Sequence, residues 1–233
     1  MANKFSTALL LAASLYAYAA EPDADGQKLI KRIPAGYRLY NYSQIIDEKG
    51  EDLIARGDLN GDGADDYALV IENIANNNIS GIMIFFKDGN DYKLALENRN
   101  CFNSGKDLDF GLSTPHSINI AKGNLYLNYS QMFNCDYSNQ KYTARYRNSE
   151  FELIGYDDVY TSCGRYGEAG DTKTSINFPA KKQLNAECPY KKKCKETWTT
   201  IAVKEPILLR KLSGIDFGTI ISKYIVKADG TEK

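Results

Sequence analysis

Acidic and amide side chains crowd into residues 58–66, which read Asp-Leu-Asn-Gly-Asp-Gly-Ala-Asp-Asp. Side-chain oxygens fall at loop positions one, three, five and nine, and a glycine falls at six, where a chain that wraps a cation turns sharply. Calcium prefers about six to eight oxygen ligands, whereas magnesium seldom uses a dedicated protein loop, so the pattern predicts a calcium site. The predicted ligands are the side chains of Asp58, Asn60, Asp62 and Asp66 and the carbonyl of Ala64.

The same residue types are common in ordinary turns, because Asn, Asp and Gly tolerate left-handed backbone and cap their own amides. A plain turn explains less well why four carboxylates fall within nine positions. Close pairs of them in a partly desolvated loop repel by roughly 1–3 kcal/mol, and a bound cation would remove that repulsion. Both interpretations stay open, and we expect calcium.

Two strands must hold this loop. Residues 67–71 are apolar or β-branched over the length of a strand, and residues 53–56 form a similar, shorter run before the loop. An EF-hand would continue into a helix with a glutamate at loop position twelve, where this chain has Leu69. The EF-hand is therefore excluded, and we expect the loop to join two strands of a sheet.

Residues 57–63, together with Asp66, resemble the calcium-loop repeats of the FG-GAP and VCBS type, known from integrin-like β-propellers and many secreted bacterial proteins. The resemblance covers about fifteen residues, and the chain has one copy rather than the several of a propeller. It implies calcium held beside a β-strand, for structure or for adhesion.

The remaining pattern predicts a mainly β fold, with antiparallel sheets built from consecutive hairpins and a minor helical or irregular N-terminal part. Each predicted hairpin has two apolar runs around a short polar turn, and two further strands follow. The hairpins pair residues 79–87 with 92–97, 117–121 with 124–129, and 141–147 with 150–155, and the added strands are 174–178 and 197–203. Residues 207–224 have a weak helical period that two glycines interrupt.

Tyrosine is abundant, with seventeen in the chain, so an aromatic binding platform is one interpretation of Tyr142, Tyr146, Tyr156 and Tyr160. The other is packing of one sheet face, which suits the high β propensity of tyrosine. We expect packing.

Five cysteines suggest disulfides in an oxidising compartment. Cys188 and Cys194 are close in sequence around a proline, so we expect them to be bridged. We expect Cys101 to pair with Cys135, which leaves Cys163 as the free thiol.

The clearest charge cluster is the basic run Lys191, Lys192, Lys193 and Lys195 around Cys194. Such a run is often only solvated. Held by a disulfide, it could instead present positive charge to an anionic glycan, a lipid head group or an acidic protein cleft.

The sequence has no recognisable catalytic motif and one histidine, His116. A cysteine nucleophile would have to pair Cys163 with His116. We therefore expect a calcium-binding interaction protein, of the inhibitor or immunity type by analogy. The alternative is a secreted or envelope hydrolase that uses a pair of acidic residues, which spacing alone cannot identify.

Residues 1–19 carry Lys4, an apolar run and small residues at positions 17 and 19, the order of a secretory signal peptide. The apolar run is too short to span a bilayer, and no later stretch approaches the ~20 apolar residues that a span needs. We expect residues 20–233 to form one domain, periplasmic or secreted. Without Lys4 it has 28 basic and 30 acidic residues, a net charge of −2, which argues against a nucleic-acid partner.

Export predicts that the protein recovered from its natural source begins at Ala20. Mass spectrometry of the N-terminal peptide would check this. Intact Met1 in the soluble cytosolic fraction would contradict export.

Overall fold

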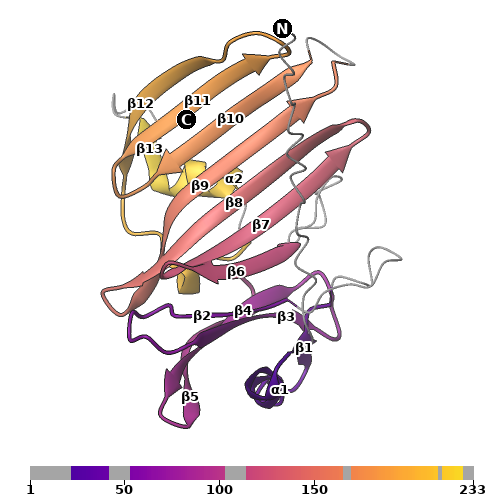
Figure 1. The fold of residues 1–233 in the computed structure, drawn as a ribbon, viewed down its shortest axis with the longest axis vertical. Coiled ribbons are helices and arrows are strands. Elements are labelled where there is room, and N and C mark those ends of the chain that lie inside the picture. Colours follow the sequence, from indigo (N-terminus) through magenta and orange to yellow (C-terminus); the bar gives the residue numbers. More distant parts are fainter. Residues whose placement is uncertain (1–21, 42–52, 103–113, 165–168, 215–216, 228–233) are drawn as a thin grey trace, which may run out of the picture.

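The computed structural model describes residues 22–41, 53–102, 114–164, 169–214 and 217–227. The fold is mainly β, as predicted, and consists of two antiparallel sheets with a few short helices (Figure 1). The predicted signal peptide, residues 1–19, lies outside the described residues. No described helix has the length and apolar character needed to cross a membrane.

The smaller sheet has five strands in the order β1-β3-β4-β5, and β2 also pairs with β3. Its strands are β1 (Tyr37–Leu39), β2 (Ile54–Gly57), β3 (Asp66–Asn73), β4 (Ser80–Asp88) and β5 (Asp91–Asn98). Helix α1 (Ala24–Ile30) covers one of its faces and confirms the helical part expected near the N-terminus (Figure 1).

Strand β3 is buried on both faces, which explains its unbroken apolar run. Tyr67, Leu69 and Ile71 pack on the side of α1, against Leu29. Ala68 and Val70, on the opposite face, join the larger core.

The larger sheet has eight strands in the order β13-β12-β11-β10-β9-β8-β7-β6. They are β6 (Ser117–Ala121), β7 (Asn124–Phe133), β8 (Asp136–Arg147), β9 (Glu150–Ser162), β10 (Gly170–Asn177), β11 (Lys182–Pro189), β12 (Lys195–Val203) and β13 (Ile225–Lys227). All three predicted hairpins are confirmed as β4–β5, β6–β7 and β8–β9. The sequence analysis missed β11 and β13.

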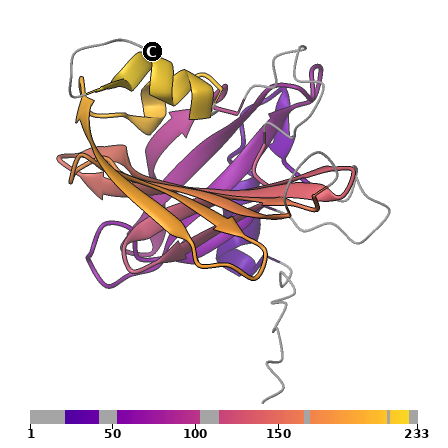
Figure 2. The ribbon, with the colours of Figure 1, turned by 90° about the horizontal axis from the view of Figure 1, so that it is seen from above.

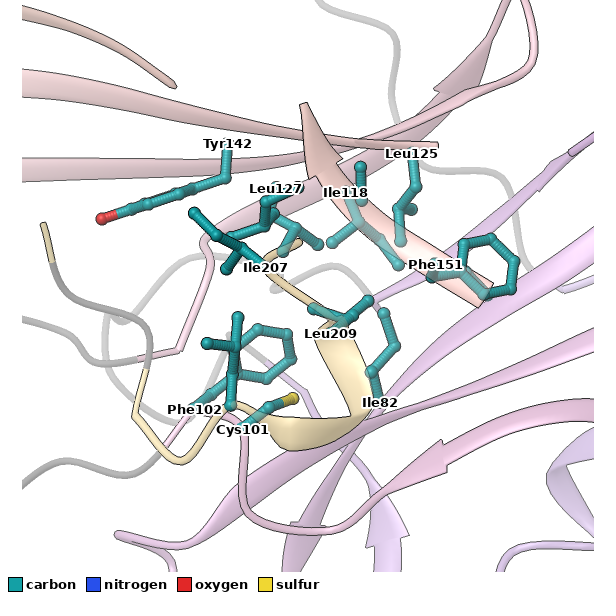
Figure 3. Packing of buried hydrophobic residues seen from close by; sticks show 14 of the residues in the cluster. Ile82, Cys101, Phe102, Ile118, Leu125, Leu127, Tyr142, Phe151, Ile207 and Leu209 are labelled. Carbon is teal, nitrogen blue, oxygen red and sulfur yellow. The ribbon is translucent and has the colours of Figure 1, made fainter. Parts of the chain in front are cut away.

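One hydrophobic cluster contains residues of both sheets. Between the sheets lies the segment before and within the 3-10 helix η2 (Leu209–Lys211), whose Ile207 and Leu209 side chains are fully enclosed (Figure 3). Helix α2 (Phe217–Tyr224) lies against one face of the larger sheet and adds Ile220 to the cluster (Figure 2). The weak helical period over 207–224 thus corresponds to two short helices. The two sheets therefore share one core; the single domain over residues 20–233 stays a prediction.

Three of the four candidate platform tyrosines, Tyr142, Tyr146 and Tyr156, pack in the core as expected, whereas Tyr160 is half-buried and donates a hydrogen bond to Asp136 at 2.8 Å. Tyr129, Tyr142 and Tyr156 are buried on three adjacent strands, with ring centroids 5.5 and 4.9 Å apart. Tyr146 contacts Phe86 of the smaller sheet at 4.8 Å, which ties the two sheets together.

The two ends of the larger sheet differ. At one end, here called the junction end, the β8–β9 turn lies against the smaller sheet through Tyr146 and Phe151. At the other, called the disulfide end, lie Cys135, Cys163, Cys188 and Cys194. The face that carries Tyr142, Tyr156 and Ile176 near the junction end carries polar residues toward the disulfide end, where the core no longer covers it.

Helix α1 is fixed to the smaller sheet by Asp23, its N-cap. The Asp23 carboxylate accepts hydrogen bonds from Gly26 N at 2.8 Å and from the Tyr67 hydroxyl at 2.7 Å, and pairs with Arg56 at 2.9 Å. These contacts, the Gly26 amide first, lower the pKa of Asp23.

Replacing Asp23 by alanine should lower the free energy of unfolding by about 1 kcal/mol at neutral pH, the usual contribution of an N-cap. Because the folded-state pKa is depressed, this contribution is present above the unfolded value of 3.8 and is lost as the pH falls through the folded value. Urea titrations of the parent and variant at several pH values would measure it. Asp23→Asn keeps an acceptor oxygen for Gly26 and should lose less; equal losses would contradict the capping role.

Candidate functional site

The predicted calcium loop connects β2 to β3 as expected, and Gly57 faces Asp66 where the two strands begin to pair. Gly57 also lies against Ile120 of β6, since an added Cβ would stand 2.8 Å from Ile120 Cγ2. The loop therefore starts where the two sheets meet.

Asp58 organises the first half of the loop. Its carboxylate accepts hydrogen bonds from Gly61 N at 2.6 Å and from Gly63 N at 3.0 Å. Both glycines have positive φ, 82° and 84°, which few other residues adopt readily. The chain thus wraps around the carboxylate at loop position one.

Asn60 and Asp62 continue the same pattern. The Asn60 side-chain oxygen accepts from Asp62 N at 2.9 Å, and the Asp62 carboxylate accepts from Ala64 N at 2.8 Å. The Asn60 amide nitrogen donates to the second Asp62 oxygen at 2.9 Å. In each of these hydrogen bonds the acceptor is a side-chain oxygen of a predicted calcium ligand.

Asp66 is fully buried, unlike the other predicted ligands. Its two oxygens accept from Leu59 N at 2.8 Å and from Lys87 N of β4 at 2.9 Å. Burial raises the pKa of Asp66 above its ordinary value, the two amides oppose this rise, and the charge of Asp62 adds to it. The buried carboxylate is therefore stabilised by hydrogen bonds but lacks a full compensating charge.

Asp65 lies outside the predicted ligand set, as the spacing indicated. Its carboxylate pairs with Arg56 at 2.8 Å, and Arg56 also pairs with Asp23 at the start of α1. The loop is thereby connected to the helix through one guanidinium group.

The residues present fit a hard cation, because all predicted ligands are oxygens on a loop that glycines allow to curl. The carboxylates of Asp58, Asp62 and Asp66 do not bring three oxygens within 4.8 Å of one another. Among described residues, only Cys135, Asp136 and Cys163 bring three acidic, thiol or imidazole ligand atoms within 4.8 Å of one another. The cysteines of that group form a disulfide, so they hold no metal. Calcium at the loop would have to draw the carboxylates inward, and the site stays a prediction.

The structure confirms one predicted disulfide and corrects the other. Cys188 is bonded to Cys194, as expected. Cys135 is bonded to Cys163, so the predicted Cys101–Cys135 bridge is wrong, and Cys163 is not the free thiol. This also removes Cys163 as a nucleophile for His116. Cys101 is instead a buried free cysteine, and burial raises the pKa of its thiol.

The basic loop is exposed at the disulfide end, held by the Cys188–Cys194 bridge. Lys191, Lys192, Lys193 and Lys195 are all exposed, and Tyr190 beside them is 67% exposed. Glu187 and Glu196 flank Lys195 on paired strands, so the positive charge is concentrated at the turn itself.

A polar depression that the sequence analysis missed lies next to this loop. It has a volume of about 210 Å³. Its lining is formed by three adjacent strands and consists largely of hydroxyl, amide and charged groups: Thr172, Lys173, Thr174, Asn185, Ala186, Glu187, Lys195 and Thr197. The signal in the sequence was the alternation of Thr172, Thr174 and Ile176 along one face of β10. A pattern of alternating apolar residues does not identify this face, because two of the three side chains are polar.

Two described carboxyl groups have a pKa raised by burial, Asp66 and Asp158. A general acid for hydrolysis needs such a shift and a second carboxyl within about 10 Å. Asp158 accepts a hydrogen bond from Ser138 at 2.8 Å. The second carboxyl of such a pair stays ionised, so these shifts do not identify it, and the acidic-pair hydrolase stays a prediction.

No protein-family model, curated protein or solved structure matches this chain. The function is therefore argued from the site alone.

The buried state of Cys101 predicts that it resists a thiol-alkylating reagent in the folded protein. After unfolding without reduction, one thiol per chain should react, and peptide mapping should place it at Cys101. Reduced and unfolded protein, with all five cysteines labelled, serves as the control. Labelling of Cys135 or Cys163 before reduction would overturn the assignment.

Proposed function

We propose that this protein is an exported interaction domain stabilised by calcium at residues 58–66. The observation that carries the proposal is the buried Asp66, whose carboxylate lies at the end of the loop of predicted ligands and whose pKa is raised by burial. A cation beside Asp66 and Asp62 would lower the cost of keeping both charged.

Calcium fits this site better than magnesium because the loop supplies many oxygens at the protein surface in an adaptable ring. Asp58, Asn60 and Asp62 are held by the amides of the loop, but each oxygen has a further lone pair for a cation. Binding would gather the ligands around Asp66 without changing the strands on either side.

Export and interaction rest on separate observations. The first nineteen residues have the pattern of a signal peptide, and two disulfides suit a periplasmic or secreted protein. The basic loop at residues 191–195 is held in place by one of these disulfides, away from the calcium loop (Figure 1). We assign it to an anionic protein, glycan or lipid partner, because its exposed ammonium groups could contact such a surface without rearrangement.

Calcium should raise the melting temperature of the parent protein, because a ligand that binds the folded state stabilises it by about 1.4 kcal/mol for each tenfold excess over Kd. Magnesium at equal concentration should do much less. Asp62→Ala should abolish the calcium effect. Asp62 is the best position to change, because Asp66→Ala would also leave the buried amides of Leu59 and Lys87 without an acceptor.

Asp65→Ala is the matched control, since Asp65 pairs with Arg56 outside the ligand set and its loss should leave calcium binding in place. Isothermal titration of chelator-treated protein would measure affinity directly. Absence of both binding heat and a calcium-dependent melting shift in the parent would reduce residues 58–66 to an ordinary polar turn.

A further inference from the structure

Strand β12 has an edge that no described strand covers over part of its length. It pairs with β11 over Lys195–Thr200, while β13 covers the other side only from Ile201 to Val203. Within the described part of the chain, no strand pairs with the remaining stretch on that side, and all six of its residues are exposed. An uncovered edge of this kind is a template for another strand.

The direction of the backbone groups along this edge follows from two hydrogen bonds. Ile201 N donates to Lys181 O, on the β11 side, at 3.0 Å, and Lys204 N donates to Tyr224 O, on the β13 side, at 2.9 Å. Because N–H and C=O groups alternate along a strand, the even-numbered residues point outward. Glu196, Trp198 and Thr200 therefore present their backbone groups to the open edge.

The side chains of the edge are suited to pairing. Thr197, Trp198, Thr199 and Thr200 all have high β propensity, and the segment has no proline or bulge to block another strand. Trp198 is the only tryptophan of the chain and is 63% exposed at the middle of the edge.

We propose that this edge pairs, antiparallel and about a twofold axis, with the same edge of a second copy of the chain. Five registers bring the outward-pointing residues 196, 198 and 200 face to face. Pairing Trp198 with Trp198 would put Lys195 opposite Ile201 of the second copy, a place that Lys227 of that copy already fills, and the two registers that pair Thr200 with Trp198 or with Thr200 have the same conflict. Pairing Glu196 with Glu196 would set two carboxylates directly opposite, which is destabilising.

The remaining register has no such conflict. Glu196 faces Trp198 of the second copy, Lys195 faces Thr199, and the two Thr197 residues face each other at the axis. The outward groups of Glu196 and Trp198 then form two hydrogen-bonded pairs, each with two bonds. The two eight-stranded sheets become continuous, and the depressions that Thr197 lines meet across the axis. This pairing needs no calcium and does not rest on the function proposed above.

The register can be tested by cross-linking. Cβ atoms of opposed residues in such a non-hydrogen-bonded pair lie at the short end of about 4.5–5.5 Å, so a small movement brings them to the about 3.5–4.5 Å of a disulfide. Thr197→Cys should therefore give a disulfide-linked dimer on mild oxidation. Thr199→Cys is the matched control, because Thr199 is also exposed but faces Lys195 of the second copy. Equal cross-linking of both variants, or none of Thr197→Cys, would overturn the register.

The association itself can be followed through Trp198. From micromolar to submillimolar protein, light scattering should rise from one toward two chain masses, while tryptophan emission shifts to shorter wavelength. Thr197→Lys would oppose two ammonium groups at the axis and should stay at one chain mass, with the parent's circular dichroism as the check on folding. A single chain mass and unchanged emission throughout would overturn the proposal. So would blue-shifted emission at a single chain mass, which would mean another occupant.

Discussion

The buried carboxylate of Asp66 joins three parts of the smaller sheet. It begins β3, and it accepts one hydrogen bond from the loop at Leu59 and another from β4 at Lys87. An ionised carboxylate without partners in such a place would cost several kcal/mol. Backbone amide groups reach the Asp66 carboxylate because of the turn after β2, the course of residues 58–65 and the pairing of β3 with β4. The loop is therefore more than a connection, because its first residues serve as donors to the group that anchors its end.

The two ends of the larger sheet differ in how they are stabilised and in how far they are exposed. Near the junction end its strands share a core with the smaller sheet through Tyr142, Tyr156 and Phe151. Toward the disulfide end the same face carries threonines, Asn185 and Glu187, and apolar packing contributes little. The two disulfides lie at this end and substitute for a core there, since a cross-link limits the unfolded chain where few contacts hold the folded one. A sheet fixed in this way can present charged and hydroxyl groups on strands that would otherwise fray.

The sequence predicts hairpins correctly where the residues of the turn and the alternation of apolar and polar residues in the strands agree. The β6–β7 hairpin has Ile118, Leu125 and Leu127 on one face around Lys122-Gly123, and both positions of that turn have positive φ. Strand β11 was missed because Lys182–Pro189 contains only one strongly apolar aliphatic residue, Leu184; its place is set by neighbours on both sides.

The disulfide pairing depends on the register of the strands, which the number and spacing of the cysteines do not determine. Tyr137 faces Thr161 across β8 and β9, which brings Cys135 and Cys163 to the same end, whereas Cys101 is enclosed beside Phe102 in the core. For the loop, spacing predicts the ligand set. It could not reveal that Lys87, twenty-one residues beyond Asp66, would compete as a donor to the same carboxylate.

The predicted calcium loop and the edge of β12 lie in different sheets, and this limits how one can influence the other. The loop contacts the larger sheet at Ile120 of β6, the strand at the opposite side from β12. Five strands lie between β6 and β12, and each is fixed by pairing on both sides, so a shift of the loop ligands has no hinged element through which to reach Trp198. Calcium would then change association at β12 only by changing the fraction of folded chains. Above the melting transition this effect would be large, and well below it, where nearly all chains are folded, it would vanish.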